Sequence, residues 1–322
     1  MRDDQQSLRD ALRPLEQAEF QIGGCESLLS DVFSTVKENV KTGVHWVGAK
    51  AGDGAVKALR GASNALAQTL LTRRMKISLI AQKLRKEENV IKESGTFSAS
   101  FLAKYTSSGF GDDLAGDLKV LLDVLKDINK FELDLEATYK KELALFKEMV
   151  NIKSTDSAIT LINKLDNLTY PVPDFSASHD SMLKSQALPG GKCFVFDKQT
   201  HLFSIETKEL SAEQTSVSFA KEELVSLLRD INEIVDRYKV LSAAHEKYAD
   251  YIRDFNTVVG KSFVHLETLK GSVSFNLIRD LESRLRGNPS VFSFYTGFLP
   301  KFTLYLDDYV DGLTTFLSKQ LN

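Results

Sequence analysis

The sequence predicts an all-α protein: an elongated helical bundle with long, heptad-patterned helices and one small β-hairpin. Apolar residues recur every three or four positions through most of the chain, which is the spacing of a helix with one buried face. One stretch near the end keeps apolar residues at seven-residue steps over about five repeats. Residues 171–210 depart from this pattern, with prolines, glycines and short β-rich runs.

The composition is that of an ordinary globular chain and excludes several classes of protein. Of the 322 residues, 43% are apolar and 26% are charged, so the chain is not wholly disordered. No apolar run reaches the roughly 18 residues of a spanning helix, and residues 1–6 do not resemble a signal peptide. Two cysteines, Cys25 and Cys193, are too few for a disulfide framework or a four-ligand zinc site. We therefore expect no integral membrane insertion, and either a reducing cytosol or a compartment without redox demands.

Changes in composition divide the sequence into four segments. These are residues 1–93, a basic N-terminal helical region; 94–170, a helical bundle; 171–210, a linker with the β-hairpin; and 211–322, a C-terminal long helix and helical bundle.

In the first segment, a short helix is predicted over residues 5–20, and an amphipathic stripe beside Trp46 follows over residues 29–47. Glycines between residues 43 and 61 each cost about 1 kcal/mol in a helix interior relative to alanine. That stretch is therefore predicted to be a weak helix, or two helices with a loose joint. A firmer helix is predicted over residues 62–93.

In the second segment, Asp112 or Asp113 can accept the free amide protons of a first helical turn. A helix is therefore predicted from there to about residue 150. Glu132 and Glu142 interrupt its apolar face, which favours a bundle helix over a strict coiled coil. A short helix is predicted over residues 154–168.

The third segment holds the predicted hairpin. Pro171 and Pro173 end the helical pattern, because proline lacks an amide proton and disfavours helix in the residue before it. The runs Cys193–Phe196 and Leu202–Ile205 then flank a polar loop. Because an isolated hairpin is marginal in water, we expect it to pack on the helices or on a partner.

The fourth segment carries the clearest pattern in the chain. Ser211 and Ser218 are N-cap signals for a helix of roughly 38 residues, about 57 Å long. The helix of residues 114–150 is its expected packing partner. The block 261–322 holds two further predicted helices, separated at residues 286–289. The two series of heptad positions are Leu224, Ile231, Tyr238, His245, Ile252 and Val259, and Leu227, Ile234, Leu241, Tyr248 and Phe255.

No catalytic, metal-binding or cofactor motif is complete. Gly260-Lys261-Ser262 resembles the end of a phosphate-binding loop, but Phe255 stands where the first glycine is required and no strand precedes it. His245-Glu246 lacks the second histidine of a zinc-protease helix, and the five histidines show no metal-ligand spacing. His245 occupies one of these heptad positions, which favours a packing role. The sequence shows no residue that would serve as a base for the Cys193 thiol. We therefore expect a protein without enzymatic activity, metal or cofactor, which acts by binding.

Positive charge is concentrated between residues 37 and 86. This stretch holds eleven lysines and arginines against two acidic residues, a net charge of +9, so the remainder carries −12 within a total of −3. Such asymmetry favours an acidic partner, either nucleic acid or an anionic membrane face. Alternatively, the basic helix lies on the acidic remainder of its own chain. The candidate nucleic-acid-binding residues are Lys37, Lys41, Lys50, Lys57, Arg60, Arg73, Arg74, Lys76, Lys83, Arg85 and Lys86.

The layout of the chain resembles the internal head proteins of large tailed bacteriophages. The shared features are an amphipathic Gly-, Lys- and Trp-containing segment, here residues 32–50, and a basic stretch, here residues 71–76. A helical middle, a Pro-Gly-Gly element with a hairpin at residues 189–206 and a long helical tail follow.

This resemblance implies a non-enzymatic virion protein, made in the host cytoplasm and packaged in the capsid interior with the genome. Its implied partners are packaged DNA or another polyanion, and capsid or other virion proteins. The DNA would be bound through phosphate contacts without base readout, and ejection together with the genome is compatible with this role.

Two alternatives belong to other functional classes. A membrane-active helical protein, similar to α-helical pore-forming toxins, is favoured by the stripe at residues 29–47 with Trp46. The polar hairpin tip at residues 197–200 argues against it, since a membrane tongue should be apolar. A host-directed phage inhibitor is the other alternative, in which the acidic remainder of the chain mimics DNA.

Overall fold

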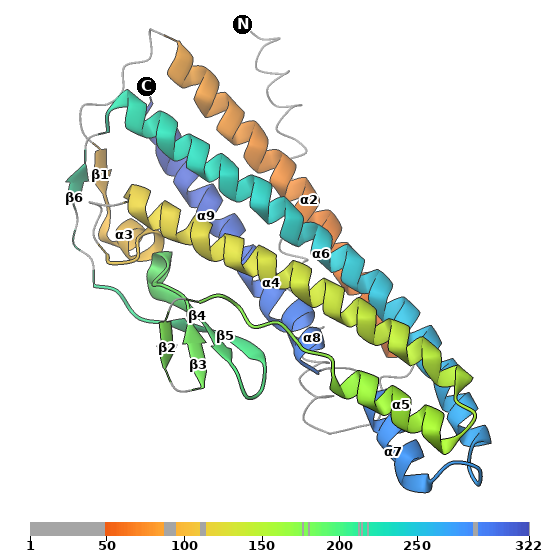
Figure 1. Ribbon diagram of the computed structural model, residues 1–322. Coiled ribbons are helices and arrows are strands. Elements are labelled where there is room, and N and C mark those ends of the chain that lie inside the picture. The colour runs from red at the N-terminus through yellow and green to blue at the C-terminus, as the bar shows by residue number, and fades with distance from the viewer. Residues whose placement is uncertain are drawn as a thin grey trace, which may run out of the picture.

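The fold is mostly helical, with a small antiparallel sheet (Figure 1). The computed structural model describes residues 49–86, 95–109, 114–175, 177–179, 181–211, 213, 215–217, 219–285 and 289–321. The predicted helix at residues 5–20, the stripe at residues 29–47 and the caps at Asp112, Asp113 and Ser218 lie outside the described residues.

Four long helices lie side by side: α2 (Ala49–Arg85), α4 (Leu114–Glu148), α6 (Lys221–Thr268) and α9 (Leu299–Lys319). Ion pairs give their directions. Arg60 meets Asp250 and Arg74 meets Asp236, so α2 runs antiparallel to α6.

Helices α4 and α6 run in the same direction. Glu136 of α4 contacts Lys247 of α6, and further along both helices the Phe146 carbonyl accepts a hydrogen bond from Ser262. Parallel neighbours need a long connection, and this one carries the whole linker of the predicted third segment.

Helix α2 corrects the prediction of a weak or jointed helix before residue 62, because it is continuous from Ala49. Leu59 is buried, and the Ser63 hydroxyl donates to the Ser242 carbonyl of α6. Contacts with α6 thus offset the cost of the glycines in this stretch.

Helix α6 begins close to the predicted N-cap signals but is 48 residues long rather than about 38. Ten of the eleven predicted heptad positions are buried, and Phe255 is partly buried. The helix continues past residue 259 because Ser262 and Leu266 are also buried, against the end of α4 and the residues beyond it.

The connection from α4 to α6 passes through η1 (Met149–Asn151) and α5 (Thr155–Asp166), where Ser154 is the N-cap. The chain then returns beside α4 to four strands, β2 (Ala177–His179), β3 (Met182–Lys184), β4 (Lys192–Asp197) and β5 (Leu202–Thr207), all antiparallel in that order (Figure 1).

Strands β4 and β5 form the predicted hairpin, with Phe194 opposite Ile205 and Phe196 opposite Phe203. The hairpin packs on the helices. The rings of Phe194 and Phe302 lie 4.8 Å apart, and those of Phe203 and Phe298 are stacked at 4.6 Å.

Several short elements lie near the end at which α6 begins (Figure 1). Strand β1 (Gly95–Phe97) pairs with β6 (Thr215–Val217), and helix α3 (Ala99–Tyr105) follows with Ser98 as N-cap. The turn η2 (Pro189–Gly191) packs against α3. Gly191 has a φ of 64°, and a Cβ there would overlap the Lys208 carbonyl oxygen.

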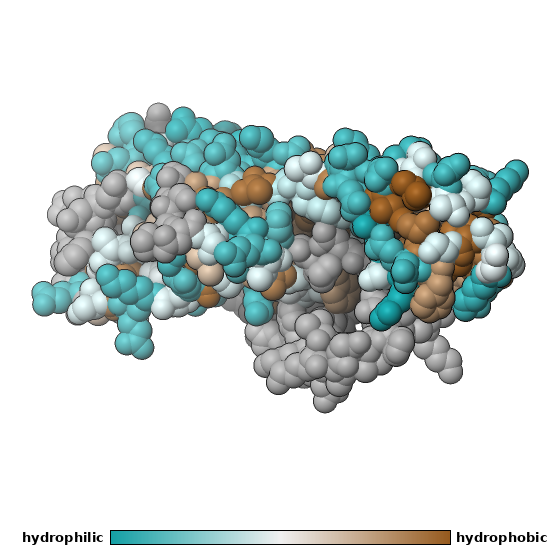
Figure 2. Space-filling model, turned by 60° about the horizontal axis from the view of Figure 1, so that its bottom comes forward, coloured by the Kyte–Doolittle hydropathy of each residue, from teal (hydrophilic) through white to brown (hydrophobic). Residues whose placement is uncertain are grey.

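The chain ends with α7 (Phe275–Arg284), α8 (Pro289–Ser293) and the π-helical turn η3 (Phe294–Phe298), which leads into α9. The prediction of two helices after residue 260 was therefore wrong for the first of them, because α6 ends at Thr268 and α7 begins only at Phe275. Figure 2 shows apolar side chains gathered toward the end of the molecule where α5 and α7 lie. Val264 and Phe275 are exposed.

The hydrophobic core falls into two clusters. The larger one joins residues from all four predicted segments, among them Leu59, Leu118, Phe194 and Leu224. The smaller one joins the ends of α4 and α6 with α5 and α7. None of the described helices combines the length and apolarity needed to cross a membrane.

Candidate polyanion-binding helix

Helix α2 carries most of the candidate binding residues. Lys37 and Lys41 lie outside the described residues, and the side chains of Lys50 and Lys57 are not described. The other seven candidates lie along α2 and at its end: Arg60, Arg73, Arg74, Lys76, Lys83, Arg85 and Lys86.

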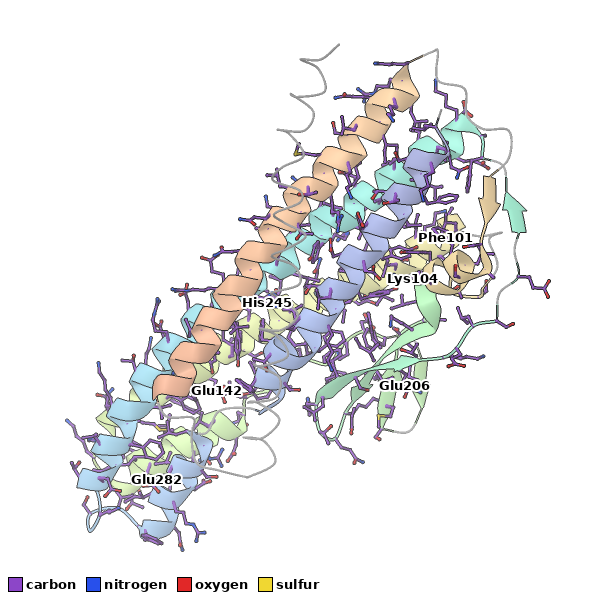
Figure 3. The ribbon with its side chains drawn as sticks, turned by 180° about the vertical axis from the view of Figure 1, so that it is seen from behind. Phe101, Lys104, Glu142, Glu206, His245 and Glu282 are labelled. Carbon is purple, nitrogen blue, oxygen red and sulfur yellow. The ribbon has the colours of Figure 1, made fainter. Side chains whose placement is uncertain are left out.

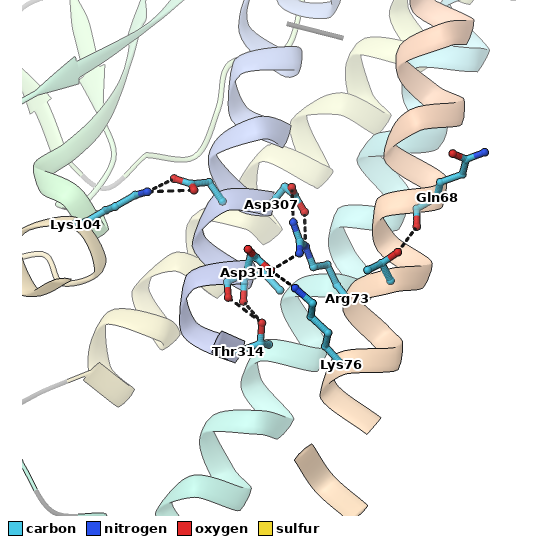
Figure 4. Close-up of polar contacts among 10 residues, drawn as sticks. Gln68, Arg73, Lys76, Lys104, Asp307, Asp311 and Thr314 are labelled. Carbon is cyan, nitrogen blue, oxygen red and sulfur yellow. Dashed lines mark hydrogen bonds and ion pairs between the residues drawn. The ribbon is translucent and has the colours of Figure 1, made fainter. Parts of the chain in front are cut away.

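Arg73 is the centre of an ion-pair group between α2 and α9 (Figure 4). Its guanidinium donates to both carboxylate oxygens of Asp307, at 2.9 and 3.1 Å, and also to Asp311. Lys76 reaches the same Asp311 oxygen at 2.7 Å. The side chains of Arg73 and Asp307 are only 11% and 14% exposed, so water weakens their ion pair little.

The electrostatics of Arg73 follow from these contacts. Burial alone would lower its pKa, but the hydrogen bond and the charges of Asp307 and Asp311 raise the pKa above the ordinary arginine value. Arg73 is thus a permanently charged link within the fold, and its donors are directed at protein carboxylates.

Two further candidates form ion pairs with α6. Arg60 meets Asp250 at 2.7 Å, and Arg74 meets Asp236. All four side chains are about half exposed, and such surface pairs contribute roughly 0–1 kcal/mol. These pairs can therefore open at little cost.

The last turn of α2 differs from the rest of the helix. Lys83, Arg85 and Lys86 are all exposed, and Arg85 and Lys86 form no ion pair with any residue in the described part of the chain. Cations at a helix C-terminus interact favourably with the helix dipole. Three adjacent cations at the tip of a helix can reach neighbouring phosphates of a polyanion.

The exposed face of α2 also holds an apolar stripe that was not predicted from the sequence. Leu71, Met75 and Leu79, spaced by four residues, are 64%, 59% and 58% exposed. The sequence contained a signal for this stripe, because these three apolar residues form a second series at helical spacing beside the predicted core series. Together with the terminal cations the stripe makes α2 amphipathic on its outer side.

Buried polar residues on α4 and α6 are a second notable feature, and Glu142 and His245 are labelled in Figure 3. Glu132 is fully buried and accepts a hydrogen bond of 3.1 Å from the Tyr295 hydroxyl, and burial raises its pKa. Burial raises the pKa of Glu142 to about 7, against hydrogen bonds from Tyr170 and Tyr251. His245 is fully buried, and burial lowers its pKa to about 4.

No three His, Cys, Asp or Glu side chains among the described residues lie close enough to hold a metal ion. The Cys193 thiol is partly buried and donates to the Ser185 carbonyl of the neighbouring strand segment at 3.2 Å.

Comparison with known proteins gives no relative. No protein-family model matches the sequence, and no curated protein or solved structure is significantly similar to the chain.

Proposed function

We propose that the chain is a non-enzymatic structural protein, packaged with the genome in the capsid interior of a large tailed bacteriophage, and that α2 binds DNA without sequence preference. The observation that carries the DNA-binding part is the exposed cationic last turn of α2, formed by Lys83, Arg85 and Lys86. The virion assignment is supported by the resemblance of the layout to internal head proteins.

The ion pairs of the other α2 cations restrict the proposed DNA-binding site to the last turn of the helix. Arg73 and Lys76 are held by Asp307 and Asp311, so phosphate would have to displace a carboxylate to reach them. The last turn has no such competition at Arg85 and Lys86 within the described residues. DNA backbone contacts release condensed counterions, so binding should weaken steeply with salt.

The test compares a triple and a double alanine variant in binding to a generic DNA duplex at about 50 and 200 mM salt. We expect Lys83→Ala/Arg85→Ala/Lys86→Ala to weaken binding strongly and to reduce the slope of log affinity against log salt by about 3. The matched control, Arg60→Ala/Arg74→Ala, removes cations that already have carboxylate partners. Equal losses in both variants, or full binding retained by both, would contradict the assignment to the last turn.

The helices also suit a structural role. We propose that they form an elongated bundle, in which the heptad spacing of α6 keeps it in contact with neighbouring helices over its length. Such a rod would separate the cationic last turn of α2 from a second contact surface at the end formed by α5 and α7. Capsid or other virion proteins are the proposed partners there.

A second candidate function is association with an anionic lipid surface. The stripe Leu71, Met75 and Leu79 favours it, because interfacial helices combine an apolar face with flanking lysines and arginines. Co-sedimentation with phosphatidylglycerol-containing vesicles tests this function, with neutral vesicles as control. Binding lost in Met75→Glu would support it, whereas binding to neither vesicle would exclude it.

A further inference from the structure

A cavity of about 360 Å³ lies between α3, the turn η2 and α9. None of the α2 cations lines it, so a ligand in this cavity would be independent of the proposed function. Lys104, which is labelled in Figure 4, and its ion-pair partner Asp308 belong to its lining.

The walls of the cavity are fixed by specific contacts. The Gly190 amide donates to the Thr106 carbonyl at 2.9 Å, and the Tyr305 hydroxyl donates to the Pro189 carbonyl at 3.1 Å. Gly190 has a φ of 74°, a conformation that suits glycine. The turn therefore joins both helices, and the cavity is part of the fold.

Two ammonium groups line the cavity, each above an aromatic ring. The Lys104 nitrogen lies 5.4 Å from the centre of the Tyr105 ring, and the Lys192 nitrogen lies 5.7 Å from that of Tyr305. Lys104 pairs with Asp308 at 2.9 Å, whereas Lys192 forms no ion pair with any residue that the structure describes. One negative and two positive side chains leave a net charge of +1 in the lining.

A buried tyrosine, Tyr309, is also among the residues that line the cavity. Tyr309 is 2% exposed, and its hydroxyl has no hydrogen-bond partner among the described residues. Leaving a buried donor unpaired costs free energy, so a group that accepts its proton in a hydrogen bond would be stabilising. Burial keeps the pKa of Tyr309 well above its usual value, which makes this hydroxyl a donor at neutral pH.

We propose that this cavity binds the phosphate group of a small phosphate monoester. Lys192 and Lys104 supply positive charge, and Tyr309 supplies a neutral donor. A phosphate offers more acceptor oxygens than a carboxylate, which matches three donors from different elements. The cavity is larger than an inorganic phosphate needs, and the rings of Tyr105 and Tyr305 line the space for a small organic group.

The test is calorimetric titration of the full chain with phenyl phosphate, with inorganic phosphate and phenol as reference ligands. We expect saturable binding of phenyl phosphate, weaker binding of inorganic phosphate and none of phenol. Lys192→Gln should weaken phenyl phosphate binding about tenfold. Lys153→Gln, which removes an exposed lysine outside the cavity lining, is the matched control and should bind normally.

Tyr309→Phe separates a binding role from a structural one. It removes only an oxygen without a described partner, so the melting temperature of the unliganded protein should stay level or rise. Phenyl phosphate binding should nevertheless weaken severalfold. An affinity unchanged in both Lys192→Gln and Tyr309→Phe, or no saturable binding up to about 10 mM, would overturn the proposal.

A competition experiment with DNA distinguishes a small phosphate monoester from the phosphates of a DNA backbone as the ligand of the cavity. Phenyl phosphate should not compete with a duplex bound through α2, because the cavity lies at other residues. If Lys192→Gln abolished duplex binding while phenyl phosphate failed to bind, the assignment to a small ligand would be wrong.

Discussion

At the residue scale, Glu142 shows how a buried acid links proton binding to stability. The side chain is 7% exposed between α4 and α6, and burial raises its pKa from 4.5 to about 7. The folded protein therefore holds a proton that the unfolded chain releases. The resulting contribution to stability is fully present below pH 4.5 and is lost as the pH rises through 7.

His245 has the opposite dependence. Its pKa falls from 6.5 to about 4 on folding, so its contribution is present above pH 6.5 and is lost as the pH falls through 4. Between pH 4.5 and 6.5 the two groups offset one another, and above that range the Glu142 effect remains. In that range the pH profile of the wild type therefore conceals both contributions.

The variant Glu142→Gln should expose the Glu142 contribution. Glutamine has the same shape but no charge, so we expect the free energy of unfolding to exceed that of the wild type above pH 7, by up to about 3 kcal/mol. The difference should disappear near pH 4.5, where the wild-type residue is protonated when folded. Urea unfolding across pH measures it, with the exposed Glu148→Gln as control. A difference that did not vary with pH would contradict this role of Glu142.

These residues also show which properties of a single residue can be predicted from the sequence. The heptad position of His245 predicted that it is buried, because the spacing of apolar residues indicates which helix face is covered. The hydroxyl that donates to Glu132 Oε1 belongs to Tyr295, 163 residues away. No periodicity relates the two positions, so the hydrogen bond follows only from the tertiary fold.

At the scale of elements, the docking of α3 on α9 depends on Gly312. A Cβ at this position would overlap the phenol of Tyr105, so the missing side chain lets the tyrosine lie directly on α9. Glycine is otherwise a poor residue inside a helix, by about 1 kcal/mol relative to alanine.

The same substitution at two glycines should therefore have opposite effects. Gly312→Ala should lower the melting temperature, because the steric conflict with Tyr105 outweighs the gain in helix propensity. Gly260→Ala, in α6 with no atom within 4 Å of the added methyl group, should raise it slightly. Differential scanning calorimetry gives the sign of both, and a stabilising Gly312→Ala would show that α3 is not fixed in this position.

Elements were predicted from the sequence where a pattern was long, although α6 extends beyond its predicted end. The β4–β5 hairpin and the core of α6 were predicted from alternation and from heptads. Strands β2 and β3 have three residues each, too few to show alternation, and they form by pairing with β4 directly or in turn. The early start of α2 was missed because contacts with α6 override glycine propensities.

At the scale of the whole molecule, the uneven charge of the sequence is partly neutralised by the fold. Asp236, Asp250, Asp307 and Asp311 lie 162 to 238 residues beyond their partners on α2, in the acidic remainder of the chain. The sequence predicts both charged regions but leaves open whether they meet. The structure pairs four described cations and leaves the last turn of α2 exposed, so the candidate site is smaller than the basic stretch.

The strength of this neutralisation should depend on burial rather than on the number of ion pairs. Arg73→Met leaves Asp307 beside α2 without its bidentate partner, at a site where both side chains are at most 14% exposed. Breaking such a pair should lower the free energy of unfolding by about 3 kcal/mol. Arg60→Met breaks a pair that is almost half exposed and should cost less than about 1 kcal/mol.

Urea unfolding at low and high salt distinguishes the two kinds of pair. The small Arg60 effect should disappear at high salt, because exposed pairs are screened, whereas the Arg73 effect should persist. Equal costs for the two variants would mean that α2 is not held against α9 by Arg73. The basic helix would then be available to a polyanion along its whole length, and the cationic site would extend beyond Lys83, Arg85 and Lys86.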